Sequence, residues 1–183
     1  LCLVDLIDTC ESLILPLCQA KQIQLKVDID PHISPFLVGD SIRLQQVLGN
    51  LLTNAVKFTP TGNVTLKMQL QPSSRNELQR ICFGVIDTGE GIAQADQRRL
   101  FDAFTQGDES STRQHQGVGL GLAIVKHSVA LMGGEISLDS DKGQGCYFYF
   151  TLDLATDTNK VTRDENKLLV ITSAKSTLLN QVI

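Results

Sequence analysis

The run RICFGVID at residues 80–87 limits the possible folds more than any other feature of the sequence, because it is almost entirely apolar. Strands that are buried on both faces read as continuous apolar runs, whereas half-exposed strands alternate. We therefore predict a central, two-sided strand at 80–87. Alternating segments predict further strands at 23–29 and 63–70, and the segments 135–140 and 145–154 predict a closing pair around DKGQG.

Segments with helical periodicity lie between these strands. Apolar residues recur every three or four positions from 3 to 20, which predicts an amphipathic helix in which Pro16 causes a kink or marks a weak last turn. Asp40 is a suitable N-cap for a second helix at 41–57. A third helix at 120–132 is expected to stop at the two glycines that follow it.

Two long segments have no strand pattern of their own. Residues 31–39 form a turn-rich connector, and residues 88–118 contain only a short helical piece at 94–102. A connection as long as 88–118 inside a compact domain is usually functional and is often a lid.

Composition excludes several classes of protein. The chain of 183 residues is 42% hydrophobic and 20% charged, which is typical of a globular protein. A net charge of −4, with no basic or basic-aromatic cluster, argues against a nucleic-acid partner. The 5 cysteines show no CxxC spacing, so we expect reduced, buried thiols and neither a disulfide framework nor a zinc site.

The chain is expected to be part of a longer protein that has several domains. It begins within a helical pattern and has no initiator Met, and it contains no apolar run of about 18 residues that could span a membrane. A polar segment follows Leu154, and KLLVITS then begins a new buried strand. We predict a domain at 1–154, a linker at 155–166 and the truncated start of a following domain at 167–183.

The predicted helix at 41–57 carries an unusual polar stripe opposite its apolar face. The stripe contains two asparagines four residues apart, which are poor helix formers, and a lysine near its end; its members are Arg43, Gln46, Asn50, Asn54 and Lys57. Amide oxygens suit a hard cation and an ammonium group suits phosphate. A solvated helix face is the alternative interpretation.

Two glycine-rich segments suggest a ligand. In VIDTGEGI, Asp87 ends the apolar strand, where its carboxylate can accept a hydrogen bond from an exocyclic amine; an ordinary Asp-Gly turn is the alternative. At 117–121, three alternate glycines precede a helix and fit neither the dinucleotide fingerprint nor the Walker loop. Because the N-terminus of a helix attracts anions, we predict that this backbone surrounds phosphate groups.

Taken together and in order, these segments resemble the catalytic ATP-binding domain of sensor histidine kinases, within the gyrase, Hsp90, histidine kinase and MutL superfamily. DSIRLQQVLGNLLTNAVKFT resembles the asparagine box, DTGEGI the first glycine box and LFDAFTQGD the phenylalanine box. GVGLGLAIVKHSVALMGGEI resembles the second glycine box, and GQGCYFYFTL the closing glycine-rich segment. The resemblance implies the Bergerat ATP-binding fold, an α/β two-layer sandwich with a mixed, mainly antiparallel sheet, helices on one face and an ATP lid.

The resemblance also implies roles for individual residues. Asn54, supported by Asn50, would bind Mg²⁺. The implied catalytic residues act on the metal or the phosphates and are Asn50, Asn54, Lys57 and Arg113. Asp87 would accept a hydrogen bond from the adenine amine. The implied nucleotide-binding residues are Asp87, Gly89, Gly91, Ile92, Phe101, Phe104, Gly117, Val118, Gly119, Leu120 and Gly121. Gln116 and Val118 depart from the residues common in the family.

The implied activity is binding of Mg-ATP and donation of its γ-phosphoryl group to a histidine on a separate dimerisation domain. Gln46 lies where the ATP-hydrolysing relatives carry a catalytic Glu, which favours a kinase over an ATPase clamp. A pseudokinase that acts as a regulatory module is the second alternative. None of His32, His115 and His127 has the sequence context of the phosphoacceptor, so we expect no self-phosphorylation.

The resemblance also implies partners and a location. The parent is expected to be a homodimeric hybrid kinase anchored in the bacterial inner membrane, with this chain as a monomeric, cytoplasmic part. Its partners would be the dimerisation domain of the same kinase and a response regulator or receiver domain. The segment at 167–183 resembles the start of a receiver that lacks the usual acidic residues after its first strand.

Overall fold

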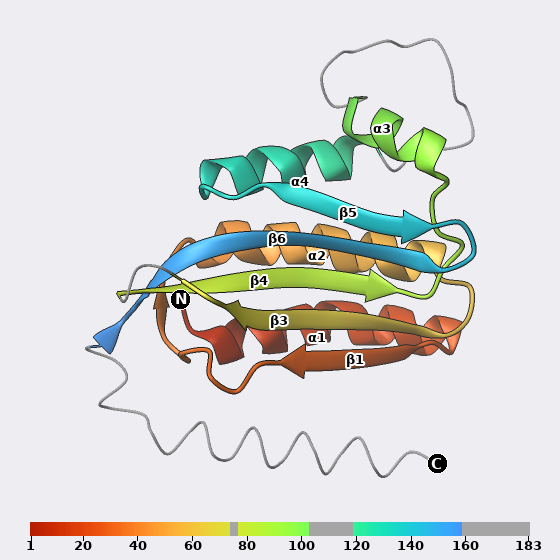
Figure 1. The fold of residues 1–183 in the computed structure, drawn as a ribbon. Coiled ribbons are helices and arrows are strands. Elements are labelled where there is room, and N and C mark those ends of the chain that lie inside the picture. The colour runs from red at the N-terminus through yellow and green to blue at the C-terminus, as the bar shows by residue number, and fades with distance from the viewer. Residues whose placement is uncertain (74–76, 103–118, 159–183) are drawn as a thin grey trace.

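The computed structural model describes residues 1–73, 77–102 and 119–158 (Figure 1). The helices are α1 (Leu3–Lys21), α2 (Ser41–Phe58), α3 (Gln94–Asp102) and α4 (Gly119–Leu131). The strands are β1 (Gln24–Ile29), β2 (Leu37–Val38), β3 (Asn63–Gln71), β4 (Leu78–Asp87), β5 (Ile136–Asp141) and β6 (Gly145–Thr156). Among the described residues, all the predicted helices and strands are present, and β2 is an additional strand within the predicted connector.

The strands form one mixed sheet in the order β1-β3-β4-β6-β2, with β5 paired to β6 along the same edge as β2. Only β1 and β3 are parallel among the described pairs, and the chain connects them through α2. The other pairs are antiparallel. The predicted mixed, mainly antiparallel sheet is therefore confirmed.

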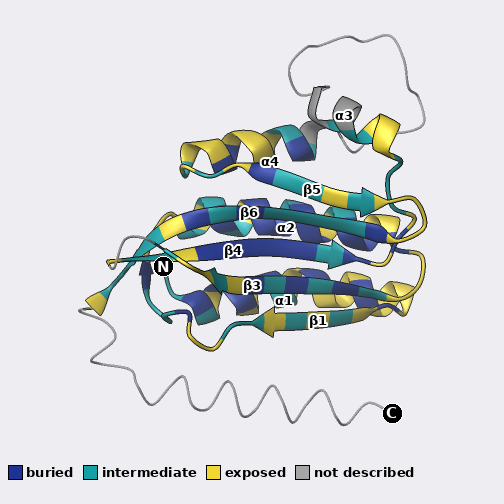
Figure 2. Cartoon of the chain, viewed as in Figure 1, coloured by how far each residue is buried: buried dark blue, intermediate teal, exposed yellow. Residues whose placement is uncertain are grey.

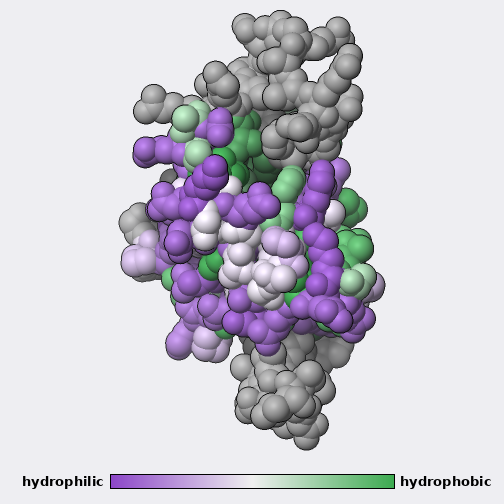
Figure 3. Space-filling view, turned by 90° about the vertical axis from the view of Figure 1, so that its right-hand side faces the viewer, coloured by the Kyte–Doolittle hydropathy of each residue, from purple (hydrophilic) through white to green (hydrophobic). Residues whose placement is uncertain are grey.

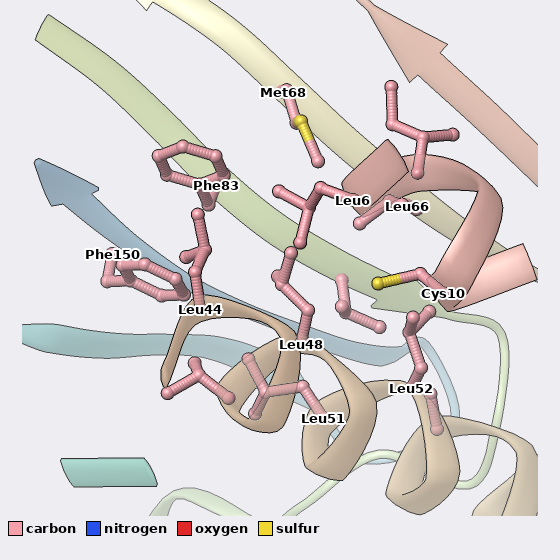
Figure 4. Close-up of a cluster of buried hydrophobic side chains, with 14 of the residues drawn as sticks. Leu6, Cys10, Leu44, Leu48, Leu51, Leu52, Leu66, Met68, Phe83 and Phe150 are labelled. Atoms are coloured by element: carbon pink, nitrogen blue, oxygen red, sulfur yellow. The ribbon is translucent and has the colours of Figure 1, made fainter. Parts of the chain in front are cut away.

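The helices α1, α2 and α4 lie on one face of this sheet, which makes the molecule a two-layer sandwich (Figure 1). The buried residues gather between the layers (Figure 2). In the centre, Leu44 of α2 points toward Phe83 and Phe150, whose rings stack with centroids 5.5 Å apart, and Leu48 points toward Leu6 of α1 (Figure 4). The two-layer architecture is thus confirmed, and its core fixes α2 over the central strands.

The strand β4 is central, as predicted, but its two faces are covered in different ways. Phe83 faces the helices, whereas Cys82 and Gly84 face the other side of the sheet and are also buried. A Cβ atom on Gly84 would collide with the ring of Tyr147, and the Cys82 thiol lies 3.7 Å from the Tyr147 hydroxyl oxygen. A tyrosine from β6 therefore covers the second face of β4, where no helix of the described chain lies.

Both ends of α2 are capped. Asp40 accepts a hydrogen bond from the Arg43 amide at 2.9 Å, which confirms the predicted N-cap. At the other end, the Nζ of Lys21 donates to the carbonyl groups of Val56 and Lys57, each at 2.8 Å. A cation at the last turn of a helix also opposes the negative end of its dipole. The first helix of the chain therefore fixes the C-terminal turn of α2.

The helix α1 (Leu3–Lys21) confirms the helix predicted at 3–20, and Pro16 lies inside it, before the last turn. The main difference from the predicted boundaries lies in β6. The strand β6 runs to Thr156, into the segment predicted as a linker, because the short strand β2 pairs with its last residues. Residues 167–183 lie outside the described residues.

Candidate functional site

The candidate site lies where β4 ends beneath the helix layer, and Asp87 is its buried carboxylate. Asp87 is the last residue of β4 and is 5% exposed. Its Oδ1 accepts hydrogen bonds from the backbone N–H groups of Gly89 at 2.9 Å and Cys146 at 3.3 Å. Burial raises the pKa of the Asp87 carboxyl, and these hydrogen bonds oppose that shift. Neither of these backbone donors bonds Oδ2, and the Cys146 side chain is a further hydrogen-bonding partner of the carboxyl.

The glycines after Asp87 bring the following loop into close contact with two other segments. A Cβ atom on Gly89 would collide with the carbonyl oxygen of Phe58, at the end of α2. Gly91 has a φ of +64°, and a Cβ atom there would collide with the carbonyl oxygen of Asp141. Both positions require glycine for backbone packing, whatever their predicted roles toward a ligand.

Asn54 supplies the second unusual polar group of the site. Its Nδ2 is buried and has no hydrogen-bond partner within the described part of the chain. Gly121, in the first turns of α4, faces this amide, and a Cβ atom at that glycine would lie 3.8 Å from Nδ2. Leaving a buried amide unpaired costs about 1–3 kcal/mol. Such a cost is expected where a ligand completes the hydrogen bonding.

The other predicted residues on α2 flank Asn54. Asn50 lies one turn earlier and is half-buried, and Lys57 is exposed near the end of the helix. The Nζ of Lys57 lies 5.1 Å from the centroid of the Phe58 ring. The described structure therefore places the two amides partly inside the protein and the lysine at its surface.

Figure 3 looks onto the end of the sheet to which β4 points, where hydrophilic side chains predominate around a few hydrophobic ones.

A concavity of about 390 Å³ lies at the other end of the sheet, toward the start of β4, and is lined in part by Leu78, Arg80 and Asp153. From Arg80 to Asp87 a strand extends roughly 23 Å, at about 3.3 Å per residue. This concavity is therefore distinct from the candidate site.

Several predicted site residues are not described. Phe104, Arg113, Gly117 and Val118 lie outside the described residues. Phe101, Gly119 and Leu120 lie within α3 or α4, but their side-chain surroundings are also outside the description. The roles implied for them remain predictions.

The sequence did not identify the hairpin of β5 and β6 as part of the site. Ser140 Oγ accepts a hydrogen bond from the backbone N–H of Ile92 at 2.9 Å, and it lies 3.3 Å from Cys146 Sγ. Burial raises the pKa of the Cys146 thiol to about 11, and the nearby Asp87 charge adds to the shift. The only sequence signal is the glycine-rich turn, because the register that pairs Cys146 with Asp87 joins distant segments.

The chain is similar in sequence to known histidine kinases. Residues 39–156 match the family model described as histidine kinase-, DNA gyrase B-, and HSP90-like ATPase. The sensor histidine kinase GacS of Pseudomonas protegens is 40% identical over 150 residues, covering 82% of this chain and 16% of that protein. The histidine-protein kinase BarA of Escherichia coli is 40% identical over 139 residues, covering 76% of this chain and 15% of that protein.

A solved structure gives the same result. Full-length ShkA in complex with AMPPNP matches with a TM-score of 0.66 and 35% identity, covering 82% of this chain and 29% of that one. The chain thus spans only a small part of the relatives it matches. The family match begins at residue 39, although α1 and β1 lie before it and share the same core and sheet.

Proposed function

The chain belongs to the family of histidine kinase-, DNA gyrase B- and HSP90-like ATPases, and on this premise we propose that it binds Mg-ATP and donates the γ-phosphoryl group to a histidine. The acceptor would lie on a separate dimerisation domain of a two-component sensor kinase, as the likeness to GacS and BarA suggests. The observation that carries the proposal is the buried carboxylate of Asp87 at the end of β4, together with the buried Asn54 Nδ2 on α2, which has no partner among the described residues.

The carboxylate of Asp87 fits the adenine base. Two backbone N–H groups hold Oδ1 in place. We propose that Oδ2 accepts a hydrogen bond from the exocyclic amine, beside the Cys146 side chain. A buried site of this kind discriminates well, because a base without the amine would leave the carboxylate unpaired. The proposal therefore includes selectivity for adenine over bases that present an oxygen at that position.

The amides of α2 fit a hard cation. Within the described residues, the buried Nδ2 of Asn54 has no partner, which suits an acceptor such as a phosphate oxygen and leaves Oδ1 as the atom that would bind the cation. Asn50 lies one turn away on the same side of the helix. Amide oxygens are suitable ligands for Mg²⁺, which also keeps water and phosphate oxygens as ligands. When bound, Mg²⁺ would neutralise negative charge on the phosphate groups. Lys57 would contribute a further positive charge at the phosphates.

The composition of α2 favours a kinase over a hydrolase. The helix contains no Asp or Glu along its whole length, and Gln46 is exposed. Activation of water requires a base that accepts a proton, which an amide side chain does not do at neutral pH. Transfer to a histidine requires mainly positioning and charge neutralisation.

We expect the purified chain to bind ATP without steady turnover. Phosphate release from excess ATP would be followed for several hours with a coupled assay, with Gln46→Glu as a second sample. Sustained release by the unaltered chain would contradict the kinase assignment and favour an ATPase clamp. The absence of release together with nucleotide binding would support it.

The remaining features of the parent protein are also proposals. We propose that the parent is a homodimeric hybrid kinase of the bacterial inner membrane, whose receiver domain or response regulator accepts the phosphoryl group. The similarity to proteins named as sensor kinases supports this organisation. Within the described residues, no helix is long and apolar enough to cross a membrane.

We expect Asn54→Ala to remove the part of the affinity that depends on Mg²⁺ and to spare the rest. The variant keeps Asp87 and the adenine contacts, but it lacks the amide oxygen that would bind the metal. Calorimetric titration with AMPPNP, with and without Mg²⁺, measures both parts. Thr53→Ala is the matched control, since Thr53 is the exposed neighbour on the same helix and bonds only its own helix at Gly49. If Asn54→Ala retains the full effect of Mg²⁺, the metal assignment is wrong.

A further inference from the structure

One side chain of α3 is bonded to two other segments of the site. The Nε2 group of Gln97 donates to the carbonyl oxygen of Ile92 at 2.8 Å and to that of Ser140 at 2.6 Å. Gln97 is half-buried, so these bonds are partly shielded from water. A single amide group thereby joins α3, the loop after Asp87 and the strand β5.

Ser140 holds the same loop residue from its other side. The backbone N–H of Ile92 donates to Ser140 Oγ at 2.9 Å, and this hydroxyl lies 2.7 Å from the carbonyl oxygen of Gly145, to which it donates. Both backbone polar groups of Ile92 are therefore engaged, one by Gln97 and the other by Ser140. The loop cannot move outward without breaking both bonds.

The hairpin that Ser140 belongs to also holds the adenine-facing carboxylate. The N–H of Cys146 donates to Asp87 Oδ1 at 3.3 Å, and the N–H of Gly143 donates to the carbonyl oxygen of Glu90 at 2.6 Å. The hairpin consequently contacts the start, the middle and the end of the segment from Asp87 to Ile92. Gln97 adds the contacts from α3, because it bonds both this segment at Ile92 and the hairpin at Ser140.

From these contacts we infer that Gln97 is a positioning residue for nucleotide binding, an inference that rests on the proposed function. Gln97 fixes the backbone of Ile92, and through Ser140 it fixes the hairpin that orients Asp87. Its two donor bonds face carbonyl oxygens, so only a side chain with N–H groups can replace them. Glutamate at this position would instead point carboxylate oxygens at two carbonyl oxygens.

The test compares two variants of Gln97 with a matched control. Gln97→Met removes both donors at similar size, and Gln97→Glu removes them and adds a charge. Gln94→Glu adds the same charge to an exposed position of the same helix. Calorimetry would measure the Kd for ADP and for adenosine, and thermal unfolding without ligand would measure the stability of each variant.

We expect the two Gln97 variants to raise the Kd for ADP about tenfold, which corresponds to about 1.4 kcal/mol. The Kd for adenosine should rise by the same factor, because the bonds of Gln97 act on the loop beside the base. Gln94→Glu should bind ADP within about twofold of the unaltered chain. A role in folding alone would lower the unfolding temperature and leave the Kd of the folded protein unchanged.

Ser140→Ala provides an independent check, because it releases the other polar group of Ile92. In the combined variant Gln97→Met with Ser140→Ala, the Kd for ADP should rise by less than the product of the two single increases, because both changes act on Ile92. If the unaltered chain binds no ADP, the proposed function fails and the inference fails with it. If it binds ADP and the Gln97 variants bind equally well, or the two changes act independently, the inference alone is overturned.

Discussion

We expect Asp87→Asn to weaken the binding of ADP about 100-fold, the combined effect of a lost charged hydrogen bond and a new unpaired donor. The backbone N–H groups of Gly89 and Cys146 would hold the remaining oxygen of the asparagine in the place of Oδ1. The NH₂ group would then lie where Oδ2 was and would face the amine of adenine, so two donors would meet. Calorimetric titration with ADP measures the loss.

The same substitution should leave the ligand-free protein at least as stable as before. Burial raises the pKa of Asp87 in the folded state above its ordinary value of 3.8. The folded protein therefore binds more protons than the unfolded chain between these two pKa values, and stability falls as the pH rises through that interval. Above that interval the buried, ionised carboxylate costs stability, and the neutral amide removes this cost.

Asp139→Asn is the control for the loss of one negative charge, since Asp139 is exposed on β5. It should change neither the affinity for ADP nor the unfolding temperature appreciably. If Asp87→Asn binds ADP as well as the unaltered chain does, the carboxylate does not contact the base. If it instead lowers the unfolding temperature, Asp87 has mainly a structural role.

The sequence predicted the fold because its signals are local. The apolar run at 80–87 identified the central strand, the three- and four-residue periodicity identified the helices, and Asp40 identified the start of α2. The family prediction is confirmed as well, because it depended on motifs whose order and spacing can be read directly. The position of Asp87 at the end of β4 followed from the same run.

The sequence did not predict the contacts made across the sheet. The register that places Cys146 opposite Asp87 depends on the pairing of strands about sixty residues apart, and no local pattern encodes it. No sequence pattern singled out Gln97 within the helical segment at 94–102. Gly91 was predicted as a nucleotide-binding residue from the resemblance, and its close contact with the backbone of Asp141 could not be predicted from the sequence.

We expect Gly145→Ala to destabilise the protein by about 3 kcal/mol and to abolish measurable binding of ADP. Of the lost stability, about 1–2 kcal/mol comes from the backbone conformation at this position and the rest from a collision. Gly145 has a φ of +84°, and a Cβ atom there would collide with the carbonyl oxygen of Asp87. The end of β4 would have to move, and the carboxylate with it. Urea unfolding measures the stability and calorimetry the binding.

Gly143→Ala separates the collision from the backbone conformation. Gly143 lies in the same turn with a φ of +85°, but a Cβ atom there would meet nothing within 4 Å. The free energy of unfolding of this control should therefore fall by only about 1–2 kcal/mol, the conformational cost that both variants share, and the control should still bind ADP. The difference between the two variants then measures how strongly the hairpin is packed against Asp87. Equal losses of stability and equal binding in the two variants would show that this packing does not determine the position of the carboxylate.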